Sequence, residues 1–244
     1  MKKKINSITF IIPIFNETIR LNYLFKRIYF FISKYKNIKT EFILINDGSN
    51  DNSKEKVDKF VNKIKKIIKI DISLISYKVN KGKGFAIKKG ILKSTGDWII
   101  TLDADLSVDF NQIIKWNNKF EFTTNRAYWG SRVLKSSRTK SIIIRRLLGL
   151  ILFFILKIFF NFKIKDTQCG FKLYHKSYVK KLFNQLKIYD FTHDIKLLIL
   201  LIKLDVEVEE LPVNWTHYSN SKVRLFYDSI NFLIKIIVFK FQKI

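Results

Sequence analysis

The sequence predicts an α/β fold in which a mostly parallel β-sheet is covered by helices on both faces. Short apolar runs rich in β-branched and aromatic residues alternate with longer stretches whose apolar residues recur at helical spacing. Strands and helices that alternate in this way pack as a parallel sheet between helical layers. The 244 residues are 48% hydrophobic and 15% aromatic, which is enough to bury a substantial core.

Five runs predict strands, and two stretches between them predict helices most clearly. The helices span residues 21–35 and 52–68, and the strands span residues 8–14, 41–46, 72–76, 97–102 and 127–131. After about residue 135 the alternation gives way to a strongly apolar segment and a less regular part. We expect residues 1–135 and 136–222 to form two halves of one domain, with an apolar helix at 142–164 and an amphipathic helix at 223–244.

The chain is strongly basic, with 46 Lys and Arg against 20 Asp and Glu and a formal net charge of +26. Such a surface attracts polyanions, which include nucleic acid, anionic lipid headgroups and phosphorylated substrates. Lysine is abundant in every segment, so the charge alone does not choose among these partners. Cys169 is the only cysteine, which excludes an intrachain disulfide and favours a reducing compartment.

Neither a zinc site nor a signal peptide is predicted. His175, His193 and His217 lack the close spacing of zinc ligands. The N-terminal apolar run is only as long as a strand and is interrupted by Pro13, whereas a signal peptide needs about 7 to 15 apolar residues and a cleavage site. We therefore expect no export.

Acidic residues, glycines and one arginine follow the predicted strands. In open α/β sheets, ligands bind at the carboxyl ends of the strands, so these residues are expected to share one edge. Each motif also has a simpler explanation, because "NDGS" forms a good turn and a lone Asp-x-Asp recurs by chance. Asp47 therefore remains either structural or functional at this point. The residues concerned are Glu17, Asp47, Gly82, Gly84, Asp103, Asp105 and Arg132.

The order of the motifs "IPIFNE", "NDGSND", "NKGKGFAIKKG", "DADLS" and "GSR" resembles the family 2 glycosyltransferases, which have the Rossmann-like GT-A fold. Two later segments, "DTQCGFKLYHK" and "VNWTHYSNSK", are similar more narrowly to dolichyl-phosphate β-glucosyltransferases and bacterial polyprenyl-phosphate hexosyltransferases. The resemblance spans roughly residues 7–240. It implies inverting transfer of a hexose, with glucose favoured, from a UDP-sugar to dolichyl or undecaprenyl phosphate.

The resemblance also implies a divalent cation, Mg²⁺ or Mn²⁺, and a nucleotide pocket. Asp105 is expected to ligate the metal directly, while Asp103 approaches the ribose or the metal. A cation at this position stabilises the negative charge that develops on the departing diphosphate. The nucleotide pocket is expected at the backbone of Pro13, the side chains of Glu17 and Asp47, and the segment Gly82, Lys83 and Gly84, where a side chain on either glycine would obstruct the nucleotide.

The resemblance points to further site residues, several of them on the acceptor side. Arg132 is expected to bind a phosphate through two guanidinium nitrogens, and Gln168, with Asp166, to face the sugar. Asp194 matches the family's acidic position as a catalytic or loop-holding residue, although an acid favoured by a helix N-terminus explains it equally well. Lys222 is either a phosphate ligand or a solvated charge. Cys169 is expected to be a small buried filler.

Two other functions remain open. One is a related transferase with another nucleotide sugar or a sugar-hydroxyl acceptor. The other is a basic nucleic-acid-binding protein, which is disfavoured because grouped carboxylates repel a phosphate backbone.

Two segments predict binding to a membrane surface. The apolar run at 147–162 has 16 residues, whereas a spanning helix needs about 20. A buried core helix is the alternative. The C-terminal segment from residue 226 onward separates polar and apolar faces, as interfacial helices do. Arg145 or Arg146 is then expected to bind the acceptor phosphate. We expect a peripheral or monotopic protein at the cytoplasmic face of an anionic membrane.

Overall fold

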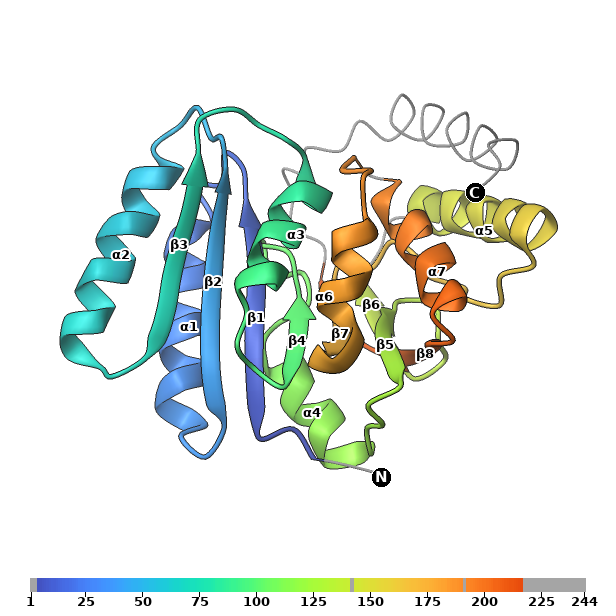
Figure 1. Cartoon of the computed structure of the whole chain (residues 1–244), viewed down its shortest axis with the longest axis horizontal. Coiled ribbons are helices and arrows are strands. Elements are labelled where there is room, and N and C mark those ends of the chain that lie inside the picture. The colour runs from blue at the N-terminus through green and yellow to red at the C-terminus, as the bar shows by residue number, and fades with distance from the viewer. Residues whose placement is uncertain (1–3, 141–142, 191, 217–244) are drawn as a thin grey trace.

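The computed structural model describes residues 4–140, 143–190 and 192–216, without the side chains of 140 and 143–148. A seven-stranded sheet forms its centre, with the order β3-β2-β1-β4-β7-β5-β8 (Figure 1). All neighbouring strands run parallel except β7, which is antiparallel to both β4 and β5. The strands are β1 Ser7–Ile14, β2 Lys39–Asp47, β3 Asp71–Tyr77, β4 Trp98–Thr101, β5 Arg126–Ser131, β7 Lys172–His175 and β8 Glu207–Pro212.

Helices cover both faces of this sheet, which confirms the predicted α/β class. A small second sheet pairs β6 (Arg138–Lys140) with β9 (Asn214–Thr216). The helices are α1 Leu21–Lys34, α2 Ser53–Ile67, α3 Lys83–Lys93, α4 Asn111–Lys119, α5 Ile143–Phe160, α6 Lys176–Gln185 and α7 His193–Lys203. The five strands and two helices predicted from the sequence all form, with ends within two residues of the expected ones.

Period-two alternation along the strands sorts their side chains into two cores. In β1, Phe10 packs with α1, α2 and α4 on one face, whereas Ile11 packs with α3, α6 and α7 on the other. The first core is rich in aromatic contacts, and the ring of Phe10 stacks on that of Phe42 with centroids 4.9 Å apart. The halves 1–135 and 136–222 share the sheet, since β7 inserts between β4 and β5.

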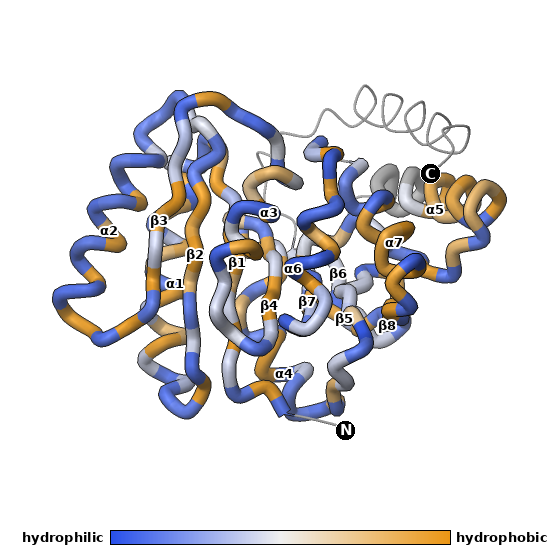
Figure 2. Tube along the Cα trace, in the orientation of Figure 1, coloured by the Kyte–Doolittle hydropathy of each residue, from blue (hydrophilic) through white to orange (hydrophobic). Residues whose placement is uncertain are grey.

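Helix α5 differs from the others because it is apolar on nearly every side, as its colour in Figure 2 shows. Only one of its described side chains, Leu156, is fully buried against the sheet-covering helices. Its exposed side chains include Leu150, Ile151, Phe154 and Ile158. Within the described ranges, no helix is both long enough and apolar enough to cross a membrane. The predicted helix at 223–244 lies outside the described residues.

Candidate functional site

A tight turn after β4 presents two carboxylates at the carboxyl edge of the sheet. The amide of Leu106 donates to the carbonyl of Asp103 at 3.0 Å, and the amide of Ser107 donates to Oδ1 of Asp105 at 2.8 Å. Leu106 has a φ of 52°, a left-handed conformation that costs energy for a branched residue and closes the turn. The "DADLS" motif therefore folds so that both acids lie at one end of β4.

The two carboxylates differ in their counter-charges. Nζ of Lys83, at the first turn of α3, lies 2.5 Å from Oδ1 of Asp103. The nearest cation to Asp105 is Arg20, whose Nη1 is 3.9 Å from Oδ2. Burial and the negative charge of Asp103 both raise the pKa of Asp105, so its charge is only partly compensated.

The segment after Asp166 approaches this pair from the acceptor half of the chain. A Cβ on Gly170 would collide with the Asp103 carboxylate, so only glycine permits the approach. The hydroxyl of Thr101 at the end of β4 donates to the Gly170 carbonyl at 2.9 Å and fixes the distance between the segments. Gly170 thus brings the acceptor-side segment into close contact with Asp103.

Gly82 and Gly84 are needed for a reason other than the expected one. Gly82 has a φ of 93°, and a Cβ there would lie 2.6 Å from the carbonyl oxygen of Tyr189. A Cβ on Gly84 would lie 2.9 Å from both Tyr189 Cα and His193 Cβ. Within the protein, the obstruction that glycine avoids is thus with Tyr189 and His193, and the expected clearance for a nucleotide stays a prediction.

Asp47 is buried, and its carboxylate accepts hydrogen bonds from the loop between β3 and α3. Its Oδ2 accepts from Nδ2 of Asn80 at 3.0 Å, and its Oδ1 accepts from the amide of Lys81 at 2.8 Å. The structural role left open for Asp47 is therefore present, at the rim where the nucleotide was expected.

Glu17 and Pro13 lie at the end of β1. Glu17 forms an ion pair with Arg20 at 3.1 Å, and its amide donates to the Ser53 hydroxyl at 2.8 Å. Pro13 pairs in register with Ile45 of β2. Both residues thus lie on the expected edge.

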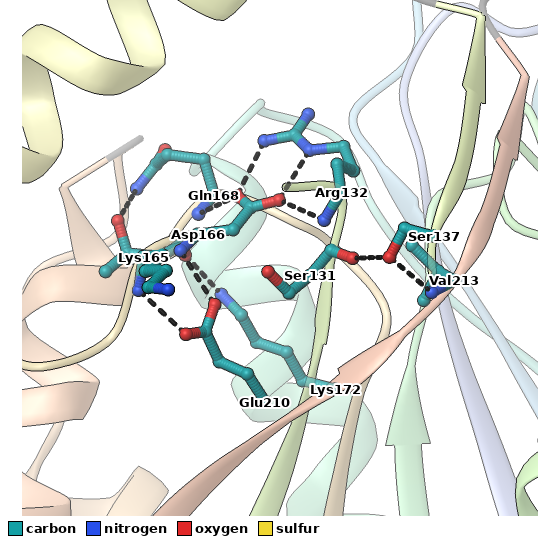
Figure 3. A network of polar contacts seen from close by, with 10 residues as sticks. Ser131, Arg132, Ser137, Lys165, Asp166, Gln168, Lys172, Glu210 and Val213 are labelled. Carbon is teal, nitrogen blue, oxygen red and sulfur yellow. Dashed lines mark hydrogen bonds and ion pairs between the residues drawn. The ribbon is translucent and has the colours of Figure 1, made fainter. Parts of the chain in front are cut away.

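Arg132 at the end of β5 is committed to an acid on its two-nitrogen edge (Figure 3). Its Nε and Nη2 donate to Oδ2 and Oδ1 of Asp166 at 2.7 and 2.8 Å, and its amide donates to Oδ2 at 2.9 Å. Burial alone would lower the pKa of Arg132, but the charge and hydrogen bonds of Asp166 raise it. In this structure Asp166 takes the two-nitrogen edge that was expected to bind a phosphate, and a phosphate-binding role of Arg132 stays a prediction.

Two residues that sequence reasoning passed over, Glu210 and Lys172, hold the 165–168 segment in place. Glu210 of β8 accepts from the amides of Lys165 and Asp166, each at 2.9 Å, and Lys172 of β7 donates to the carbonyl of Thr167 at 2.9 Å (Figure 3). The backbone of Gln168 also joins this network, donating to Oδ1 of Asp166 at 3.2 Å. The alternation of acids in "EVEELP" carried no signal that one of them would turn inward.

Asp194 is a buried ion-pair partner rather than an open base. Its side chain is 9% exposed, that of Lys172 is 3% exposed, and the two groups are in contact. Nε2 of His193 also lies 3.3 Å from Oδ1 of Asp194. Burial would raise the pKa of Asp194, but the charges of His193, Lys172 and Lys83 lower it. The contacts fit the loop-holding alternative, since Lys172 connects Asp194 to the carbonyl of Thr167, and a catalytic role stays a prediction.

Other residues lie away from the site or outside the residues that the structure describes. Asp109 is held by Arg27 through two contacts of 2.6 and 2.7 Å, so it is structural. Cys169 is buried, and burial raises its pKa to about 12, which confirms a packing role. The side chains of Arg145 and Arg146, and the whole of Lys222, lie outside the described residues.

Asp103 and Asp105 are the part of the site that could hold a metal. In the described part of the chain, no cluster of three or more His, Cys, Asp or Glu side chains forms a ready cage. A cation here would need further ligands from a substrate.

Curated relatives match this chain over most of its length. A dolichyl-phosphate beta-glucosyltransferase of Dictyostelium discoideum is 35% identical over 245 residues, which cover 95% of this chain and 73% of the relative. The enzymes of the same name from Saccharomyces cerevisiae and Homo sapiens are each 28% identical, over 94% and 89% of this chain and 73% and 69% of their own.

Solved structures share the fold. A mannosyl-3-phosphoglycerate synthase from Rubrobacter xylanophilus has a TM-score of 0.65 at 12% identity, over 95% of this chain and 72% of that one. The mannosyltransferase PcManGT from Pyrobaculum calidifontis, solved with GDP-Man and Mn²⁺, has a TM-score of 0.61 at 12% identity. That match covers 95% of this chain but 64% of the other, less than two thirds of its length.

A family model also places the motifs at the edge of the sheet within one continuous match. The model, described as glycosyl transferase family 2, covers residues 9–183, from β1 to α6. This range contains the Asp103 and Asp105 pair, Lys83 and the Arg132–Asp166 contact. The chain therefore belongs to glycosyl transferase family 2.

Proposed function

We propose that this protein transfers glucose from a UDP-sugar to a polyprenyl phosphate, with inversion at the anomeric carbon. The observation that carries the proposal is the pair of carboxylates at Asp103 and Asp105, placed at the carboxyl edge of a mostly parallel sheet beside Lys83. This is the edge where α/β folds bind nucleotides. The names of the curated relatives support both the sugar and the lipid phosphate acceptor.

The carboxylate pair fits a divalent cation, Mg²⁺ or Mn²⁺. Two neighbouring acids, one of them with a raised pKa, form a site whose negative charge is incompletely balanced. Mg²⁺ is commonly held by one or two carboxylates together with substrate phosphates, which suits a site with only two acids. Asp105 would ligate the metal, with Asp103 beside it. When bound, the cation would stabilise negative charge on the departing nucleoside diphosphate.

The acceptor chemistry needs little base catalysis. A phosphate monoester is already anionic near neutral pH, so its oxygen can attack the anomeric carbon as the bond from that carbon to the diphosphate breaks. The burial of Asp194 is compatible with this scheme, because no side chain has to remove a proton. Arg132 is held by Asp166 through Nε and Nη2, so its remaining Nη1 would be the nitrogen that binds a phosphate oxygen.

We further propose that the protein works at the cytoplasmic face of a membrane as a peripheral or monotopic protein. The exposed apolar side chains of α5, with Phe154 56% exposed and Ile158 78% exposed, suit an interfacial helix. A polyprenyl tail would stay in the bilayer while its phosphate reaches the donor. No part of this scheme requires nucleic acid.

The test is a product assay with a defined donor panel. The protein is incubated with UDP-glucose, UDP-galactose, UDP-N-acetylglucosamine or GDP-mannose, together with dolichyl or undecaprenyl phosphate and Mg²⁺ or Mn²⁺. We expect a glucosyl lipid phosphate, identified by mass, with the β configuration at its anomeric carbon by NMR. Transfer only to sugar hydroxyls, or retention of the α configuration, would contradict the proposal.

A further inference from the structure

The ammonium group of Lys83 is in direct contact with the carboxylate of Asp103. The Nζ to Oδ1 distance is 2.5 Å, and the lysine side chain is 28% exposed, so the pair is partly screened from water. The charges of Asp105 and Asp194 also act on this ammonium. Lys83 therefore lies in a field of three acids, of which Asp103 is the one it touches.

The backbone fixes where this lysine starts. The amide of Gly84 donates to the Tyr189 carbonyl at 2.9 Å, and a Cβ on Gly82 or Gly84 would strike Tyr189 or His193. The first turn of α3 is thus clamped on both sides of Lys83. The ammonium group of Lys83 can therefore change position only by rotation about the bonds of its own side chain.

A second acid lies within that field. Asp194 is buried, and its contacts with Lys172 and His193 both use Oδ1. Its negative charge acts on Lys83 and favours the ammonium even if Asp103 turns to another cation. Lys83 can therefore leave Asp103 without losing all of its electrostatic compensation.

We propose that Lys83 is a resident counter-ion of Asp103 which a divalent cation has to displace, and which thereby couples metal binding to nucleoside diphosphate binding. The inference rests on the proposed function and describes regulation of the same site. In the free protein, an entering metal ion meets the positive charge of Lys83. Only one of the two carboxylates, Asp105, then has a negative charge that is incompletely compensated. A diphosphate brings negative charge that the metal and the displaced ammonium can share, so each ligand strengthens the binding of the other.

The experiment measures binding and not turnover. Mn²⁺ is titrated into the protein and free Mn²⁺ is followed by electron paramagnetic resonance, without UDP and with saturating UDP. Lys83→Met removes the charge at similar volume, and Lys83→Arg keeps it. Lys89→Met is the matched control, because this exposed lysine lies on the same helix and its ammonium is placed over the Phe85 ring, away from the acids.

For the wild type, Lys83→Arg and Lys89→Met, we expect UDP to tighten Mn²⁺ binding by a large factor. For Lys83→Met, we expect Mn²⁺ alone to bind about tenfold more tightly and the coupling factor to fall by a similar amount, within the range of ordinary coupling energies. By reciprocity, Mn²⁺ should strengthen UDP binding less in Lys83→Met than in the wild type.

Unchanged or weaker binding of Mn²⁺ alone in Lys83→Met would overturn the inference while leaving the proposed function standing, provided that UDP and Mn²⁺ still bind together. Absence of joint UDP and Mn²⁺ binding by the wild type would overturn both. Thermal unfolding checks that each variant folds, and Lys83→Gln is read in place of Lys83→Met if the latter does not.

Discussion

At the scale of single residues, the two acids of the "DAD" motif have different surroundings. Asp103 is in contact with Lys83, whereas Asp105 has Arg20 at 3.9 Å. The negative charge of Asp105 is less well compensated by neighbouring cations than that of Asp103, which favours binding of a metal ion at Asp105. Because of this difference, we expect Asp105 to be the better metal ligand of the two.

We expect Asp105→Asn to lower turnover by about two orders of magnitude or more while the fold stays intact, because an amide keeps the shape but removes the charge that a hard cation needs. Rates at several Mg²⁺ concentrations and a thermal unfolding curve provide the measurement. Asp109→Asn is the control, since Arg27 holds that acid in a structural pair. Metal-dependent activity close to wild type in Asp105→Asn would exclude the metal role.

Arg132 shows how a buried acid can set the direction of a guanidinium. Three donors of this residue, counting its amide, converge on Asp166. We expect Arg132→Lys to lose well over tenfold in rate, because one ammonium cannot both hold Asp166 and face a phosphate. Arg126→Lys on the same strand, whose partners Glu207 and Glu209 are at the surface, should change the rate little. Unchanged kinetics for both substrates in Arg132→Lys would contradict this assignment.

Variants of the ion pair between Lys172 and Asp194 distinguish a structural from a catalytic role of Asp194. Replacing Asp194 alone with Asn leaves a buried ammonium without its counter-charge, which should cost about 3–5 kcal/mol of unfolding free energy. The double change Lys172→Met with Asp194→Leu should recover most of that loss. Urea unfolding measures both. If Asp194 were a base, the double variant would be folded and still inactive, whereas a positioning role predicts partial activity.

At the scale of elements, α5 is the helix whose composition does not match a buried or a solvated position. We expect the change of Phe154 and Ile158 to Ser to weaken flotation with anionic liposomes several-fold, because each removes apolar area from an interfacial face. Ile67→Ser on α2 is the control, since this side chain is 61% exposed on a helix at the far end of the sheet. Equal flotation of all variants, or protease protection of a segment beyond the bilayer, would exclude an interfacial α5.

Asp51 is one of the residues that join the start of α2 to the loop after β1. Asp51 accepts from the amides of Ser53 at 2.9 Å and Thr18 at 3.2 Å. Burial would raise its pKa, but the hydrogen bonds from Ser53 and Thr18 lower it to about 2. The acid thus links the two elements only while it is ionised.

At the scale of the whole molecule, ionised carboxylates stabilise a fold that carries a large positive charge. The pKa is lowered in the folded state for Asp51, and also for Asp166 and Asp194, where burial opposes and neighbouring cations favour ionisation. A depressed carboxyl pKa contributes stability above the ordinary value of about 3.9, and this contribution is lost as pH falls through the folded value.

We therefore expect the unfolding free energy to decrease steeply below about pH 4. Asp51→Asn should cost about 1–2 kcal/mol at pH 7, and the difference from the wild type should shrink toward pH 2, where the wild-type acid is itself protonated. Urea unfolding from pH 7 to pH 2 gives both curves. A constant difference at all pH values would show that the loss comes from packing and not from ionisation.

The sequence by itself determined the fold class, the positions of five strands along the chain and the edge of the sheet where the candidate site residues lie. These follow from local patterns: apolar periodicity specifies each element, and parallel strands place their carboxyl ends together. The joint order of "PIFNE", "NDGS", "GKG" and "DADLS" also indicated the family, which the family match confirmed.

Only the tertiary structure decided which charges meet. The pairing of Arg132 with Asp166, of Lys172 with Asp194 and of Glu210 with two backbone amides joins residues that are 34, 22 and about 45 positions apart. The antiparallel β7 supplies one of these partners, because it enters between β4 and β5 and carries Lys172 inward. No local period encodes such an insertion, since its stability comes from burying ion pairs and amides between elements distant in the chain.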